Sequence, residues 1–215
     1  MAKKLIIFGA GDFGREIMYS AMENMKGSFE INAFLDDDTS KIGTKLEGIV
    51  VISLNDIVKK IDSDTSIIIG IGDPIFREKV LDRLKAVVPN ASFATIIHKS
   101  VVVMPNVVIE EGVFVAPQTT LAIGSHLKCH SAINQNVSIG HDTVVGEYSV
   151  ISPGCVLSGR TKIGNTTFLG SNVVTYPKVS IGSYCSVSAS TVVARNLKNK
   201  NTLVLKQNTM ALPRE

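Results

Sequence analysis

The residues best suited to chemistry are His141 and the carboxylate that follows it, Asp142. They interrupt a segment, NQNVSIGHDTVVGEYSVISPG, that otherwise consists mainly of aliphatic residues, glycines and small polar residues. A neutral imidazole can remove a proton from a nucleophile near neutral pH, because its reference pKa is about 6.5. A neighbouring carboxylate orients the ring and stabilises the imidazolium that forms. The pair therefore indicates general-base catalysis, although a surface histidine beside an aspartate can also be merely solvated.

The segment around His141 belongs to a repeat with a period of six residues. Aliphatic residues recur at every sixth position from Ile97 to Val193, and only Thr175 departs from this rule. Small or β-branched residues recur four positions after these anchors. Neither the helical period of about 3.6 nor the strand period of about 2 produces this spacing. The period predicts a parallel β-helix, in which each short strand sends one residue inward before a corner.

Residue types at the predicted corners agree with this interpretation. They tolerate tight turns and positive φ angles. His141 lies two residues after the anchor Ile139, so we expect its side chain to point outward from a corner, where a ligand can reach it. The predicted corner residues are Asn106, Gly112, Gly124, Asn136, Asp142, Gly154, Asn165 and Asn172.

The first ~90 residues have the alternating strand and helix patterns of an α/β fold. The alternation predicts a small, Rossmann-like parallel sheet with helices packed on it. We expect this α/β domain over residues 1–94 and a β-helix domain with a C-terminal tail over residues 95–215. Strands are predicted over 3–9, 30–38 and 65–72, and helices over 13–25, 53–62 (with Ser53 as its N-cap) and 74–87.

The motif GAGDFG lies where a predicted strand leads into a helix. Its glycines, Gly9, Gly11 and Gly14, fit the pattern G-x-G-x-x-G, and Asp36 and Asp37 close the next strand. Such a turn lets the backbone and the helix N-terminus approach a diphosphate, and an acid can bind ribose hydroxyls. The glycines could instead serve only the packing of the helix on the strand. The domain is too short for a complete dinucleotide fold.

Composition limits the remaining possibilities. The 215 residues include no Trp, so an aliphatic core is expected. The three Cys are unevenly spaced, which favours a reducing cytoplasm. No run of about 18 apolar residues occurs, so neither membrane insertion nor a signal peptide is expected. From Ser149 onward the chain carries eight basic side chains and one acid, Glu215. This region could meet a phosphate-bearing ligand or could simply be a solvated basic surface; no nucleic-acid partner is expected.

The order of these segments resembles the bacterial sugar O/N-acyltransferases over nearly the whole chain. The shared segments are FGAGDFGRE, FLDD, IGIGD and a hexapeptide-repeat helix that carries HD. The family includes sialic acid O-acetyltransferases and nucleotide-sugar N-acetyltransferases. The resemblance implies a left-handed β-helix with three hexads per coil, a homotrimer, and acetyl-CoA as co-substrate. It also implies that His141 is the general base and that Asp142 tunes it.

The resemblance extends to further site residues. It implies a nucleotide-sugar site at Gly11, Asp12, Phe13, Asp36, Asp37 and Gly72, and an acetyl-CoA site at Gly159, Ser171 and Ala189, with Arg195 or Lys198 near the phosphates. Asn134, one corner away from His141, is a candidate for orienting the acceptor. The chain departs from its close relatives at Val150, where they carry a second histidine, and in its C-terminal tail, LKQNTMALPRE.

The other histidines and the cysteines are expected to be structural. We expect His98 at the junction of the two domains, and Cys155 and Cys185 in the core. Nothing beside Cys129 would make it a thiolate, so direct transfer without an acyl-enzyme is favoured. No two histidines are a multiple of 18 residues apart, so none stack, including His126 and His130, which argues against a zinc site within one chain. A zinc site shared between subunits is the alternative, but no metal is expected.

Together with the His141–Asp142 pair, the resemblance implies an acetyl-CoA-dependent acetyltransferase that modifies an amino or hydroxyl group of a nucleotide-linked sugar. The alternative is a non-catalytic trimeric protein that binds a nucleotide-sugar as a sensor or scaffold. Release of free thiol from acetyl-CoA separates these two functions.

Overall fold

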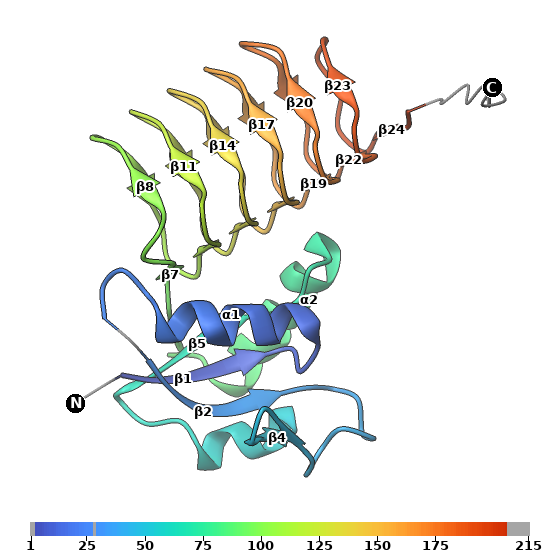
Figure 1. The fold of residues 1–215 in the computed structure, drawn as a ribbon. Coiled ribbons are helices and arrows are strands. Elements are labelled where there is room, and N and C mark those ends of the chain that lie inside the picture. Colours follow the sequence, from blue (N-terminus) through green and yellow to red (C-terminus); the bar gives the residue numbers. More distant parts are fainter. Residues whose placement is uncertain (1–2, 28, 206–215) are drawn as a thin grey trace, which may run out of the picture.

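The computed structural model describes residues 3–27 and 29–205. An N-terminal α/β unit is followed by a β-helix whose coils lie side by side above it (Figure 1). None of the helices in this described part of the chain is long and apolar enough to cross a membrane. The expected fold class, an α/β domain followed by a hexapeptide-repeat β-helix, is confirmed.

The α/β unit contains a sheet of six strands in the order β3-β4-β2-β1-β5-β6. The sheet is mixed rather than wholly parallel, because β3 and β4 form an antiparallel hairpin at one edge. Sequence patterns predicted the three central strands but neither this hairpin nor the short edge strand β6. The strands are β1 Lys3–Phe8, β2 Phe29–Leu35, β3 Lys45–Leu46, β4 Ile49–Ile52, β5 Thr65–Ile69 and β6 Ser92–Phe93.

Two α-helices and one 3₁₀-helix pack on this sheet. Helix α1 (Asp12–Met22) begins after Gly11, and α2 (Pro74–Val87) begins with proline, whose fixed φ suits a first turn. Asp73 caps α2, since its Oδ1 accepts hydrogen bonds from the N–H groups of the second and third helical residues. The predicted helix over 53–62 is instead a 3₁₀-helix, η1 (Leu54–Lys59), which Ser53 caps as expected.

The β-helix consists of three parallel sheets, here called the junction sheet, the open sheet and the lateral sheet. The junction sheet faces the α/β unit and contains β7 Ile96–Ile97, β10 Phe114–Val115, β13 Ala132–Ile133, β16 Val150–Ile151, β19 Phe168–Leu169, β22 Ser186–Val187 and β24 Thr202–Leu203. The open sheet contains β8 Val102–Val103, β11 Thr120–Leu121, β14 Ser138–Ile139, β17 Val156–Leu157, β20 Val174–Thr175 and β23 Val192–Val193. The lateral sheet contains β9 Val108–Ile109, β12 His126–Leu127, β15 Val144–Val145, β18 Lys162–Ile163 and β21 Ser180–Ile181.

The register confirms three hexads per coil. Each strand pairs with the strand 18 residues later, so that Ser138 lies beside Val156. The second residue of each strand points inward, and nearly all of these anchors form one buried core. At the two ends of the β-helix, Ile109 and Leu203 are only partly buried, and Val103 is 38% exposed. The polar anchor Thr175 is tolerated because its Oγ1 lies 2.9 Å from the Oγ1 of Thr161.

Every sixth residue from Asn106 to Ser190 has a positive φ, so the left-handed conformation marks each corner. Glycine and asparagine occupy many of these positions, but so do bulky residues such as Tyr148 (φ 61). Asn165 lies at a corner as predicted, but the left-handed conformation there is taken by the next residue, Thr166 (φ 54). Asn165 instead accepts a hydrogen bond from the N–H of Glu147 in the preceding coil through its Oδ1.

The outer face of the junction sheet packs against α1 and its neighbours in a shared apolar cluster. The ring of Phe13 in α1 meets the ring of Phe114 edge to face, with centroids 5.6 Å apart. His98 lies at the junction, as expected, since its Nε2 is 3.0 Å from Oε2 of Glu23 at the end of α1. At the other end, β24 adds a strand to the junction sheet, and residues 206–215 of the predicted tail lie outside the described residues.

Candidate functional site

His141 and Asp142 project from the corner between the open and lateral sheets, here called the His141 corner. The Nδ1 of His141 lies 2.9 Å from Oδ2 of Asp142. The two side chains are 51% and 54% exposed, so the outward orientation expected from the repeat is correct. Because an ionised carboxylate can only accept, this contact assigns the ring proton to Nδ1. Nε2 is then left as the basic nitrogen.

Gly159 lies one coil beyond His141 and faces Nε2. A Cβ at this position would overlap the imidazole ring, with Nε2 as its nearest atom. The backbone is fixed there, because the N–H of Arg160 donates a 2.7 Å hydrogen bond to the carbonyl oxygen of His141. Within the described residues, the N–H of Gly159 makes no hydrogen bond. The lack of a side chain at Gly159 therefore leaves room for the imidazole, and the unused N–H of Gly159 lies beside the basic nitrogen.

Arg160 is a charged residue of this corner that the motif did not single out. Its Nε lies 3.6 Å from the Asp142 oxygen that contacts His141. The pKa of Asp142 is lowered from its ordinary value, first by the hydrogen bond to His141; desolvation opposes this, and the charges of His141 and then Arg160 lower the pKa further. The proximity of Arg160 to Asp142 could have been predicted from the sequence, since residues 18 positions apart occupy the same position in successive coils.

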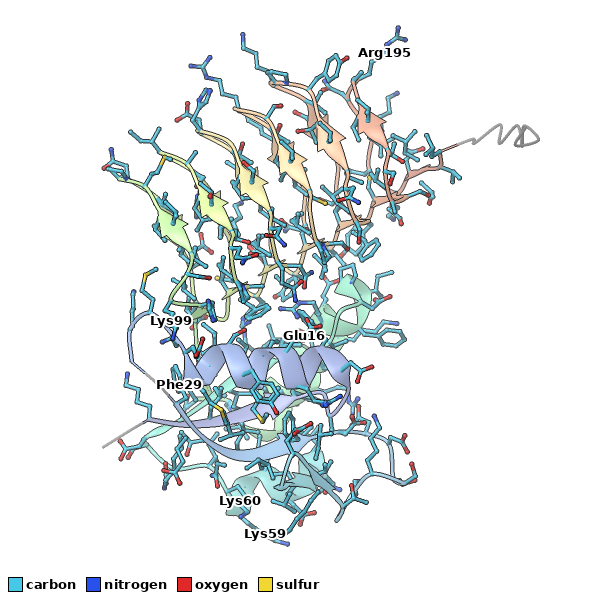
Figure 2. All side chains as sticks on the ribbon, viewed as in Figure 1. Glu16, Phe29, Lys59, Lys60, Lys99 and Arg195 are labelled. Atoms are coloured by element: carbon cyan, nitrogen blue, oxygen red, sulfur yellow. The ribbon has the colours of Figure 1, made fainter. Side chains whose placement is uncertain are left out.

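The His141 corner points away from the α/β unit of its own chain. Arg195 lies on the same corner, three coils beyond His141 in the 18-residue register. Figure 2 shows Arg195 at the margin of the β-helix remote from Lys59 and Lys60 of the α/β unit. Phe13 of the predicted nucleotide-sugar site packs on Phe114 of the junction sheet, on the side of the prism opposite this corner. The predicted base and this predicted site are therefore not brought together within one chain.

Three other predicted residues gather at a different corner, between the junction and open sheets, here called the Ser171 corner. Ser171 and Ala189 occupy equivalent positions in successive coils, since strands β19 and β22 pair directly. Asn134 is only 7% exposed, and its amide donates a 3.0 Å hydrogen bond to the carbonyl oxygen of Ile151. Asn134 thus belongs to the wall of this corner and does not lie beside His141 of the same chain.

The glycine motif separates into two packing glycines and one open glycine. A Cβ on Gly14 would overlap the carbonyl oxygen of Gly9, and a Cβ on Gly9 would overlap the backbone of Gly70. Packing alone explains these two. Gly11, the N-cap of α1, has open space on its Cβ side, and the side chain of Asp12 is 96% exposed. The first turn of α1 is accessible to a ligand at this point.

The two acids after β2 are both engaged within the α/β unit. Asp36 accepts hydrogen bonds from the N–H of Ala10 at 2.8 Å and from Lys41 at 3.1 Å. It thereby ties the glycine turn to the loop after β2. Asp37 forms a bidentate ion pair with Arg83 at 2.6 and 2.9 Å. Any ligand contact of these acids has to coexist with, or replace, these internal partners.

Gly72 borders a cavity of about 460 Å³ between the start of α2 and the β-helix. No atom lies within 4 Å of the position that its Cβ would take, so the cavity is open at this glycine. The other lining residues are Asp73, Pro74, Ile75, Thr166, Phe168, Tyr184, Cys185, Ser186 and Thr202. This cavity, which sequence patterns did not reveal, adjoins the edge of the sheet where β5 ends.

Cys129 and Cys155 have environments that favour the thiol. Burial and the neighbouring Glu110 carboxylate raise the pKa of Cys129 to about 11, and burial raises the pKa of Cys155 to about 11. Cys155 and Cys185 lie in the core as predicted. Val150, the position at which the resemblance implied a departure from close relatives, is buried against the α/β unit on the junction sheet. Within residues 3–27 and 29–205, no group of three His, Cys, Asp or Glu side chains is placed to hold a metal ion.

Two sequence-family models match the chain. Residues 4–84 match the PglD N-terminal domain. Residues 160–195 match the bacterial transferase hexapeptide model of six repeats. The first match covers the glycine motif, Asp36, Asp37 and Gly72, and the second covers the coils that follow Gly159.

Solved structures resemble both units together. The acetyltransferase domain of PglB from Neisseria gonorrhoeae, in complex with acetyl coenzyme A, is 25% identical with a TM-score of 0.84, covering 95% of this chain and 97% of that one. PerB from Caulobacter crescentus, in complex with CoA and GDP-perosamine, is 25% identical with a TM-score of 0.81, covering 94% and 93%. WeeI from Acinetobacter baumannii AYE is 24% identical with a TM-score of 0.82, covering 93% and 95%. The likeness thus spans the α/β unit and the β-helix.

Proposed function

Since the chain belongs to the PglD-type sugar N-acetyltransferase family with a hexapeptide-repeat β-helix, we propose that it transfers an acetyl group from acetyl-CoA to the amino group of a nucleotide-linked sugar. The observation that carries this proposal is the His141 corner. There a carboxylate holds the ring proton on Nδ1, and the basic Nε2 lies against Gly159, whose lack of a side chain leaves room for the ring. The site thus offers an exposed base, which N-acetylation requires.

The proposed reaction uses the corner as follows. His141 accepts a proton at Nε2 while the amine nitrogen attacks the thioester carbonyl carbon and forms the new C–N bond. The N–H of Gly159 donates to the oxygen that becomes negative, a role that fixed backbone dipoles fill well. Collapse of the tetrahedral intermediate breaks the C–S bond, and the imidazolium returns the proton to the departing thiolate. Asp142 keeps the imidazole oriented throughout.

We further propose that the site is completed by a second copy of the chain in a homotrimer. The outward residues of the open sheet are all uncharged, namely Val102, Thr120, Ser138, Val156, Val174 and Val192. Several of them are strongly exposed, Val192 at 55%. A contiguous face of this kind favours burial against another surface, and three-fold symmetry covers it in every copy at once.

The trimer explains why the predicted residues fall on different corners. The His141 corner and the Ser171 corner flank the same open sheet. When open sheets of neighbouring copies meet, the His141 corner of one chain can face the Ser171 corner and the α/β unit of the next. Acetyl-CoA would then lie between two prisms, with Gly159 on one side and Ser171 and Ala189 on the other. The basic Arg195 is available for its phosphates.

The acceptor is assigned to the α/β unit, so residues 1–94 would hold the nucleotide-sugar and residues 95–215 the acetyl donor. The diphosphate would lie at Gly11–Phe13, where the first turn of α1 is accessible. Asp36, Asp37 and Gly72 border the same edge of the sheet. Asp36→Ala is expected to weaken acceptor binding while binding of acetyl-CoA is retained, as calorimetric titrations with each ligand would measure.

The test of the proposed function is acetyl transfer itself. Purified protein is incubated with acetyl-CoA and UDP-, GDP-, dTDP- or CMP-linked amino sugars, and free thiol and the mass of the sugar product are measured. We expect thiol release that requires one of these acceptors, with a product heavier by one acetyl group. Stabilisation by a nucleotide-sugar without any acetylated product would instead identify a binding protein.

A further inference from the structure

Arg160 shares the carboxylate of Asp142 with His141. Its Nε lies 3.6 Å from Oδ2 of Asp142, the oxygen that also contacts Nδ1 of His141 at 2.9 Å. Arg160 and Asp142 occupy equivalent corner positions in successive coils, and both are left-handed, with φ 61 and φ 57. One carboxylate oxygen therefore faces an imidazole on one side and a permanent positive charge on the other.

The surroundings hold this arrangement in place. The N–H of Arg160 donates to the carbonyl oxygen of His141, which fixes the backbone beneath the guanidinium. On the opposite side, a Cβ on Gly124 would lie 2.7 Å from Oδ1 of Asp142, so only a glycine leaves the carboxylate its present position. The carboxylate thus lies between the coil of Gly124 and the coil of Arg160.

We propose that Arg160 is a positioning residue that sets the pH range in which His141 can act as a base, by drawing part of the charge of Asp142 away from the imidazole. The inference rests on the proposed function, because it concerns the base of that reaction. A guanidinium stays charged across the working pH range. It therefore opposes formation of the imidazolium at every such pH, whereas Asp142 favours it.

The other charged side chains near this corner lie further than Arg160 from Asp142. Asp142 is influenced by His141 and Arg160. Lys178 occupies the corner position one coil beyond Arg160, and Lys162 lies on the outward face of β18 in the lateral sheet. Neither lysine has an ion pair with Asp142 in the part of the chain that the structure describes. Lys178 is therefore a matched control, since it carries the same charge and the same backbone conformation.

The kinetic test compares the pH dependence of kcat/KM for the wild type, Arg160→Gln, Arg160→Lys and Lys178→Gln. Removal of the guanidinium should let the imidazolium persist to higher pH. We therefore expect Arg160→Gln to move the acid limb up by roughly 0.2–0.7 pH units, the size expected for an exposed charge pair. Arg160→Lys should restore much of the wild-type profile, and Lys178→Gln should keep it. An acid limb that Arg160→Gln leaves unmoved would overturn the proposal.

A second readout does not depend on turnover. The ring proton signals of the four histidines are followed by NMR against pH, and His141 is identified by its loss in His141→Ala. Its titration midpoint should rise in Arg160→Gln, and this rise should shrink in an Asp142→Asn background. An equal rise in both backgrounds would show that Arg160 does not act through Asp142. A wild type that acetylates no sugar would refute the proposed function instead, and the NMR result would still decide the role of Arg160.

Discussion

Arg77 of α2 donates two hydrogen bonds to the carbonyl oxygen of His130, at 2.7 and 3.2 Å. The same guanidinium donates to the carbonyl oxygens of Ile69 and Ile71 at the end of β5, and Arg77 is fully buried. One side chain thus links the α/β unit to a corner of the β-helix. Burial lowers the pKa of Arg77, and the carbonyl oxygens compensate part of the desolvation.

Replacement of Arg77 by methionine should therefore destabilise the protein strongly. The buried carbonyl oxygens of His130 and Ile69 and the partly buried one of Ile71 would lose their donor, at a cost on the order of 3 kcal/mol or more in total. Urea unfolding followed by circular dichroism measures the loss. Arg83→Met is the control, because Arg83 forms an ion pair at a side chain that is 51% exposed and should contribute less than about 1 kcal/mol. Equal effects of the two substitutions would contradict the linking role of Arg77.

The stability of the α/β unit should depend on pH through Asp36. Burial tends to raise the pKa of Asp36, but hydrogen bonds from the N–H groups of Asp38 and Ala10 and from Lys41 outweigh it and lower the pKa. A lowered carboxyl pKa adds stability above the unfolded-state value of about 3.9, and this stability is lost as the pH falls through the folded-state value. Melting temperatures between pH 5 and pH 2.5 should show a smaller acid-induced decrease in Asp36→Asn than in the wild type.

A methyl group at Gly159 should interfere with the base while leaving the fold intact. Gly159→Ala would place a Cβ against the imidazole of His141, so the ring would have to turn away. We expect turnover to fall by roughly 10-fold or more, since a misplaced base loses its alignment. The melting temperature should change little, because His141 is half exposed and can move. A variant with wild-type turnover would show that Nε2 does not need the space beside Gly159.

His141→Ala should lower turnover by roughly 10²–10⁴-fold, the range for loss of a general base. Folding should be unaffected, because the side chain points outward from its corner. His126→Ala is the matched control: His126 lies on the lateral sheet, where its Nε2 contacts Glu110, and the variant should keep the wild-type rate. Acetyl transfer is measured with acceptor and acetyl-CoA at saturation. Retained activity in His141→Ala would remove this residue from the mechanism.

The proposed trimer predicts complementation between inactive chains. Light scattering should give about three times the chain mass of 23.1 kDa. Gly11→Leu should block the acceptor site without disturbing the fold, since open space surrounds the Cβ position of Gly11. Each of the variants His141→Ala and Gly11→Leu is inactive alone, but mixed trimers refolded from both should regain part of the activity. A fully active monomer, or mixtures without any gain, would exclude a site shared between chains.

Both units of the fold could be predicted from local patterns. The six-residue period identifies the β-helix because each coil repeats the same inward, outward and corner positions, so one register covers Ile97 to Val193. The edge hairpin of β3 and β4 escaped prediction, since strands of two to four residues carry too little alternation to be recognised. The 3₁₀ form of η1 escaped for a related reason, because six residues fit either helix type.

At the corners of the β-helix, residue type alone does not predict which residue adopts the left-handed backbone conformation. Asn165 has the propensity for a left-handed conformation, yet Thr166 adopts it. Pairing between coils fixes which residue of each hexad must turn, and a β-branched threonine accepts the unfavourable φ because the surrounding ladder determines the backbone. Tertiary register thus overrides local preference by one residue.

For the candidate site, the sequence by itself determined what is adjacent in the chain. His141 precedes Asp142, and their position after the anchor Ile139 already placed both on an outward corner. Only the tertiary structure decided which residues of other coils meet them. Gly159 and Arg160 approach because the coil length is 18 residues, which stacks one corner on the next. The structure also decided that the corner shared by His141 and Arg195 lies away from the α/β unit of the same chain, as Arg195 shows in Figure 2. The reason is that the junction sheet of the triangular prism packs against that unit, so the opposite corner turns outward.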